Sequence, residues 1–217
     1  MNIASATPPE AGKVATSRTV ASSGDTGVLT VRGDLADPAT ADLVVDSAVA
    51  RFGRVDTLVN NAGLFIAKPF TGYTLEDYRA VVGVNLTGFF AVTQRAVAAM
   101  LRTGGGHVVN LTTSLTVHAN SRVPSALASL TKGGIDAATR SLAIEYAGQG
   151  IRVNAVSPGI INTPMHAHQD PAALGAMHPV GRMGEISDVV DAVLFLENAP
   201  FVTGEILHVD GGQSAGH

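Results

Sequence analysis

The sequence of 217 residues has no cysteine and no tryptophan, and only 5% of its residues are aromatic. Without cysteine, neither a disulfide framework nor a thiolate metal site can form. Charge is also sparse, at 15% of residues, and the net charge of −4 comes without any block of Lys or Arg. This balance argues against a nucleic acid as partner. The 46% of hydrophobic residues is instead typical of a globular protein.

Targeting and membrane signals are missing as well. The first ten residues are polar and do not place a basic segment before an apolar one, as a signal peptide does. The longest apolar stretch, residues 81–101, contains Asn85, Gln94 and Arg95, which favours a buried helix over a membrane span. We therefore expect a soluble cytoplasmic protein without a membrane partner.

Strand-like and helix-like segments alternate along the chain. The predicted strands are 14–18, 28–31, 57–59, 107–111, 151–156 and 206–209, and the predicted helices are 37–52, 75–102, 124–148 and 186–197. The helix at 37–52 has apolar positions Leu43, Val44, Val49 and Phe52 and stops at Gly53. This alternation predicts an α/β fold with a doubly wound parallel sheet that is covered by helices on both faces.

The segment from His107 to Gly133 combines a strand, a loop of hydroxyl side chains and a helix. We expect this helix to begin at Pro124. The loop carries Thr113 and Ser114, and the helix carries a single lysine, Lys132. Ligands of open α/β sheets bind outside the carboxyl ends of the strands, so this loop is the expected binding site.

Five further motifs occur in order: Asn60-Asn61-Ala62-Gly63, Asn85 within Val84–Gly88, Lys132 in its helix, Arg152–Gly159, and Gly204 with Val209–Gly212. Together they resemble the short-chain dehydrogenase/reductase family over residues 28–217. The resemblance implies a Rossmann-like, three-layer α/β/α fold and an NAD(P)(H) cofactor. It also implies hydride transfer between a small carbonyl compound and a secondary alcohol, and assembly into a homodimer or homotetramer through residues 81–101 and 127–143.

The resemblance implies catalytic roles for four residues. Lys132 would hold the nicotinamide ribose and tune the catalytic acid. Thr113 or Ser114 would hydrogen-bond the substrate oxygen; Thr113 matches by its distance from Asn110 and Ser114 by its distance to the helix. Asn85, which is unfavourable inside a helix without a side-chain partner, would hold a water behind the lysine.

The cofactor contacts implied by the resemblance fall in four groups. They are Asp34 and Leu35 at the adenine, Asn61, Ala62 and Gly63 at the adenosine ribose, Pro158, Gly159, Ile161 and Thr163 at the nicotinamide amide, and Ser17 and Arg18 at a 2′-phosphate. Arg18 would select NADP, with NAD the alternative. An alternative reading makes Asp34 part of a helix-initiating turn and Arg18 a surface residue. His166, His168 and His178 are expected in a mobile polar lid, without a metal.

Two features depart from the family pattern. The glycine-rich turn that cradles the pyrophosphate is absent, so we expect a chain shortened by one βα unit of about thirty residues. Residues 1–27 would then be a poorly ordered leader and strand remnant ahead of one domain, 28–217. In addition, the family tyrosine four residues before Lys132 is replaced by Ala128.

None of the three tyrosines, Tyr73, Tyr78 and Tyr146, has the required spacing from Lys132. Loss of a positioned general acid costs about 10²–10⁴ in rate. Two functions therefore remain open from the sequence: an NAD(P)(H)-dependent oxidoreductase, or a catalytically impaired relative that acts as an oligomeric scaffold for a ligand or partner.

Overall fold

The computed structural model describes residues 29–216. The expected strand 14–18 and the candidate phosphate ligand Arg18 lie outside this range. The helices are α1 Pro38–Phe52, α2 Leu75–Val82, α3 Phe89–Thr103, α4 Ala126–Tyr146, α5 Pro171–Gly175 and α6 Ile186–Glu197. The strands are β1 Thr57–Asn60, β2 Gly106–Leu111, β3 Ile151–Pro158 and β4 Ile206–Val209.

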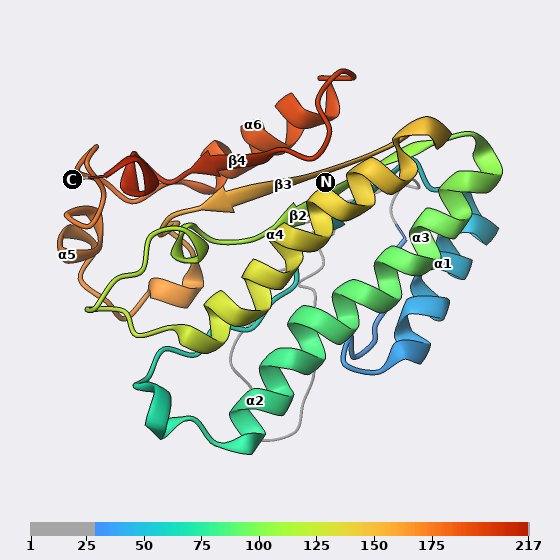
Figure 1. Ribbon diagram of the computed structural model, residues 1–217. Coiled ribbons are helices and arrows are strands. Elements are labelled where there is room, and N and C mark those ends of the chain that lie inside the picture. The colour runs from blue at the N-terminus through green and yellow to red at the C-terminus, as the bar shows by residue number, and fades with distance from the viewer. Residues whose placement is uncertain (1–28, 217) are drawn as a thin grey trace.

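The four strands form one parallel sheet in the order β1-β2-β3-β4 (Figure 1). Thr57 pairs with His107 in β2, and Gly106 pairs with Ile151 in β3, so the strands are in register at their amino ends. The prediction of a Rossmann-like α/β fold with a parallel sheet is confirmed. All carboxyl ends lie at one edge, where such folds bind ligands.

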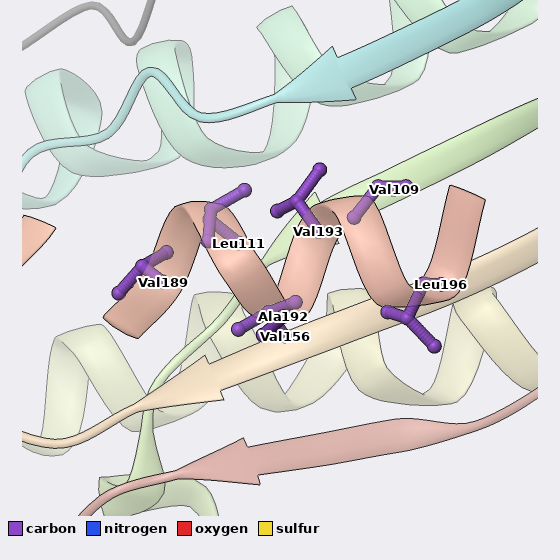
Figure 2. Packing of buried hydrophobic residues seen from close by; sticks show 7 residues of the cluster. All are labelled: Val109, Leu111, Val156, Val189, Ala192, Val193 and Leu196. Carbon is purple, nitrogen blue, oxygen red and sulfur yellow. The ribbon is translucent and has the colours of Figure 1, made fainter. Parts of the chain in front are cut away.

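Alternate side chains of the strands enter two separate cores. On one face Val109, Leu111 and Val156 pack against α6, through Val193 and Leu196 among others (Figure 2). Within the described part of the chain, α6 is the helix that covers this face. Its apolar side chains contact the odd-numbered positions of β2, which point to this side of the sheet.

On the other face Val108 and Val153 pack against Val97 and Met100 of α3 and Ala143 of α4. Helix α1 packs against α3 (Figure 1). The result is three layers with the sheet in the middle, as expected.

Helix α1 begins and ends as the sequence predicts. Asp37 caps its first turn by accepting a hydrogen bond from the Ala39 amide, and Gly53 ends it with a φ of 80°. The predicted apolar face is partly wrong, because Leu43 and Phe52 are exposed whereas Val45 is buried. The buried face of α1 is narrow: Val45 packs against Ala96 and Ala99 of α3.

The predicted helix 75–102 is present as one continuous helical stretch, Leu75–Thr103, with a π-helical segment in its middle. Helix α2 begins with a capping box between Thr74 and Asp77, a π-helical segment covers Gly83–Gly88, and α3 follows. The full stretch Leu75–Thr103 is long and apolar enough to cross a membrane. In the fold it is a core helix, because Val97 and Met100 are buried against the sheet.

Two other boundaries were predicted wrongly. Residues 29–34 form no strand, since no described strand lies beside them to pair with. Helix α4 begins at Ala126 and not at Pro124, because Ser125, with a φ of −141°, is not yet helical.

Candidate active site at the carboxyl ends of the strands

A cavity of about 340 Å³ lies at the carboxyl ends of β1, β2 and β3. Its wall is formed by the loops that follow these strands, by the first half of α4 and by the segment 160–177. This volume is in the range of sites for small ligands. The site therefore lies where the strand–loop–helix pattern of 107–133 predicts it.

Lys132 reaches this cavity from α4. Its Nζ donates a hydrogen bond of 2.6 Å to the carbonyl oxygen of Leu111, the last residue of β2. Burial lowers the pKa of Lys132 to about 8, against the opposing charge of Asp136 one helical turn further on. At pH 7 roughly nine tenths of the side chain is therefore still the ammonium form.

The loop after β1 lies directly against this lysine. A Cβ atom placed on Gly63 would come within 3.2 Å of Lys132 Nζ and 3.4 Å of Asn85 Oδ1. Any larger residue at position 63 would push the amino group aside. Asn61 and Gly63 both line the cavity, whereas Ala62 between them does not.

Asn85 lies in the π-helical segment and is 1% exposed. Its Oδ1 accepts a hydrogen bond from the Leu64 amide, and its Nδ2 donates to the Leu64 carbonyl oxygen and to Thr131 Oγ1. These three bonds join the loop after β1 to α4, the helix of Lys132. Asn85 thus has the side-chain partners that its place in a helix requires, and it positions the site without lining the cavity.

Thr113 and Ser114 both line the cavity, with different hydrogen bonds. Thr113 Oγ1 accepts from the Leu115 amide and caps a short 3₁₀ turn. Ser114 is buried, and its hydroxyl donates a 2.7 Å bond to Gln213 Oε1. Gln213 also lines the cavity and was missed by the sequence reasoning, since nothing local connects it with a serine 99 residues away.

Ala128 lies one helical turn before Lys132 and lines the same cavity with its methyl group. No tyrosine of the chain reaches this wall. Tyr73 donates its hydroxyl to the Ile66 carbonyl, Tyr78 is exposed, and Tyr146 packs against the core beside α3. The site contains no phenol that could act as an acid.

The loop after β3 closes the site opposite α4. Pro158, Gly159, Ile161 and Thr163 line the cavity, as the resemblance implies for the nicotinamide loop. A Cβ on Gly159 would meet His178 Nε2 at 2.7 Å. This close approach explains why a glycine follows Pro158.

His178 is not part of a mobile polar lid. It is 3% exposed, its Nε2 accepts from the Ile160 amide, and its Nδ1 donates to the Leu174 carbonyl. These bonds hold the ring between two loops. His166 does line the cavity, whereas His168 is exposed and does not, and no group of three metal-ligating side chains occurs in residues 29–216.

The remaining wall is mostly apolar. Besides Asn120, His166 and Gln169, it is formed by Leu64, Phe65, Leu115, Val123, Met165, Leu174, Met177, Ile186 and Val189. No sequence pattern predicts most of these residues, because they lie in irregular loops.

Comparison with known proteins agrees with this geometry. A family model described as "Enoyl-(Acyl carrier protein) reductase" matches residues 1–214. The chain belongs to the short-chain dehydrogenase/reductase family.

Several characterised members of the short-chain dehydrogenase/reductase family are similar to this chain. A 3beta-hydroxysteroid dehydrogenase 1 of Eggerthella lenta is 39% identical over 85% of this chain and 73% of its own length. A cis-4-hydroxycyclohexanecarboxylate dehydrogenase of Sinomonas cyclohexanicum is 38% identical over 86% of this chain and 77% of its own.

Among solved structures, a blue fluorescent protein from a metagenomic library in complex with NADPH is 36% identical. The match has a TM-score of 0.78 and covers 83% of this chain and 74% of the chain of that protein.

Two residues expected at the adenine of a family cofactor do not reach the cavity. Asp34 Oδ1 accepts from the Ala36 amide in the turn before α1, which is the alternative reading of this residue. Leu35 packs against Gly88 of the π-helical segment, where an added Cβ would meet the Leu35 carbonyl oxygen at 2.9 Å. Both residues have local structural contacts, and their contact with an adenine stays a prediction.

Proposed function

We propose that this chain is an NADP(H)-preferring oxidoreductase that interconverts an uncharged carbonyl compound and a secondary alcohol, with NAD as the alternative cofactor. One observation carries the proposal: Lys132, the hydroxyls of Thr113 and Ser114, and the loop Pro158–Thr163 meet at one cavity. In the short-chain dehydrogenase/reductase family this combination serves cofactor and substrate together.

The residues at the nicotinamide end fit such a cofactor. Gly63 and Gly159 have no side chain to fill this part of the cavity wall. A Cβ would approach Lys132 closely at position 63 and would collide with His178 at position 159. Asn61 and Lys132 would hydrogen-bond a ribose, and Ile161 and Thr163 would contact the amide. When bound, the nicotinamide supplies or accepts the hydride. Arg18 would pair with a 2′-phosphate.

The roles of the chain's own residues follow from their positions. The hydroxyl of Ser114 or Thr113 would hydrogen-bond the substrate oxygen. Lys132 would provide the nearest positive charge and, without a phenol between, the nearest acidic proton. Asn85 would keep the loop after β1 in place behind it. Because Ala128 cannot donate a proton, we expect turnover to be lower by about 10²–10⁴ than with a positioned phenol.

A second candidate rests on the same alanine. A chain with a ligand cavity but no phenol would bind a carbonyl compound or alcohol without turning it over efficiently. Such a protein would act as an oligomeric, ligand-binding scaffold. We propose a homodimer or homotetramer in either case, because Phe90 on α3 and Leu130 and Ile144 on α4 expose large apolar side chains. Sedimentation velocity measures this oligomeric state. We also propose a cytoplasmic location.

Calorimetry with NADPH and NADH in parallel tests the proposal. Micromolar NADPH binding would support it and justify a screen of cyclic ketones and alcohols. No binding at millimolar cofactor would exclude the oxidoreductase for this chain.

Ala128→Tyr then separates the two candidates. If the site is otherwise competent, this variant should turn NADPH over about 10²–10⁴ times faster than the natural chain. Ala128→Phe is the matched control, since it fills the same space without a hydroxyl and should give no increase. Equal turnover by both variants, with NADPH still bound, would favour the scaffold.

A further inference from the structure

We propose that Lys132 is a carbonyl-reactive amine that captures an uncharged, apolar aldehyde or ketone in the cavity as a Schiff base. The proposal needs neither a bound cofactor nor hydride transfer. It therefore concerns a second chemistry of the same cavity.

The first support is the way the amino group is held. Lys132 Nζ lines the cavity and donates to one neutral acceptor, the Leu111 carbonyl oxygen. Within residues 29–216 no carboxylate lies within ion-pair distance of it, in contrast to Lys68, whose Nζ is 2.7 Å from Asp77 Oδ2. One N–H satisfies the carbonyl, so a neutral amine keeps this bond and has its lone pair free.

The second support is electrostatic. Burial lowers the pKa of Lys132 to about 8, while the charge of Asp136 on the same helix raises it. Among residues 29–216, the only other titratable side chain on the cavity wall is that of His166. At pH 7 the neutral fraction is then about one tenth, against roughly one in several thousand for an ordinary lysine. Desolvation of this kind is how nucleophilic lysines are activated.

The third support is space. Ala128, one turn before the lysine, presents only a methyl group to the cavity. Leu115, Val123 and Met177 add apolar surface without charge. Such a wall favours an uncharged ligand with an apolar body, because burying a charge here would go uncompensated.

The reaction balances without a redox partner. The lone pair of neutral Lys132 Nζ attacks the carbonyl carbon, so that a C–N bond forms as the C=O π bond breaks, and one N–H proton passes to the oxygen to give a neutral carbinolamine. The hydroxyl of this intermediate then takes up the second N–H proton and leaves as water, while the nitrogen lone pair forms the C=N bond that replaces the C=O bond. The hydroxyls of Thr113 and Ser114, on the same wall, can relay these protons.

Reductive trapping tests the proposal. The chain is incubated at pH 7 with cyclohexanone and sodium cyanoborohydride, without cofactor, and the cyclohexyl groups are located by peptide mass mapping. The chain has three lysines, Lys13, Lys68 and Lys132. We expect Lys132 to be modified at least tenfold faster than Lys68 in the same sample, with a rate that levels off above about pH 8.

Two variants sharpen the result. Ala128→Met keeps the lysine but fills the space beside it and should slow the labelling of Lys132 at least fivefold. Lys68→Arg is the matched control and should leave it unchanged. Equal labelling of Lys68 and Lys132 in the natural chain, or undiminished labelling in Ala128→Met, would overturn the proposal. Labelling of Lys132 in a chain that binds no NADPH would support this chemistry while excluding the oxidoreductase.

Discussion

Replacing Asn85 by alanine tests the way in which the site is held together. The amide of Asn85 makes three hydrogen bonds, two to the backbone of Leu64 and one to Thr131. The alanine variant would remove all three at once. The loop after β1 would lose its connection to the helix of Lys132.

The cost follows from what each partner keeps. Thr131 retains the bonds of its hydroxyl to the carbonyls of Leu127 and Ala128. The Leu64 N–H and C=O lose their partner, and an unsatisfied buried group costs about 1–3 kcal/mol. Leu64 is only half-buried, so the lower half of that range applies. For the two groups together we expect a loss of about 2–4 kcal/mol in the free energy of unfolding, which lowers the urea midpoint by about 1–2 M.

Urea unfolding followed by circular dichroism measures this loss. Asn198→Ala is the control, since that exposed amide makes one hydrogen bond, to the Leu194 carbonyl at the end of α6. Its removal should cost less than about 0.5 kcal/mol. If both variants unfold at the same urea concentration, the loop is not held by Asn85 and the reasoning fails.

Three further changes test other parts of the structure. Burial lowers the pKa of His107 below its usual value. The hydrogen bond with Glu197 opposes this shift, and the positive charge of Arg152 adds to it. The unfolded chain therefore binds the proton first, and unfolding free energy should fall as the pH drops below about 6.5; a His107→Gln variant with an equally steep fall would contradict this. Leu196→Ala should cost about 2–5 kcal/mol in thermal or urea unfolding, because Leu196 of α6 is fully buried against the sheet. Thr74→Ala, which removes the capping box of α2, should cost about 1 kcal/mol, and no change in the urea midpoint would refute its role.

Much of the fold could be predicted from local sequence signals. Helix α6 and strand β4 have the predicted bounds, because β-branched and helical patterns end there at clear breaks. Residues 29–31, the described part of the predicted strand 28–31, have a strand-like composition similar to that of β4 but form no strand. Strand formation needs a partner at hydrogen-bonding distance, and a local pattern does not report whether one is present.

The site was predictable where it depends on strand ends and less so where it depends on distant loops. Lys132, Thr113, Ser114 and Gly159 lie on the cavity wall, as their positions after strands or on α4 suggested. Their catalytic and cofactor roles stay predictions.

Two hydrogen bonds of the site could not be foreseen, since each joins residues far apart in the sequence. They are the bond between Ser114 and Gln213 and the bond from Lys132 to the Leu111 carbonyl oxygen. Asp34 shows the opposite case, because a short polar residue before a helix satisfies its own turn.

The order of the strands also bears on how the chain comes together. Each described strand pairs with the strand that follows it in the sequence, from β1 to β4. A chain leaving the ribosome can therefore close each pair as soon as the next strand emerges, and no described strand must wait for a partner made two elements later. Growth of the sheet during synthesis exposes one unpaired edge at a time, which limits the surface open to association with other nascent chains.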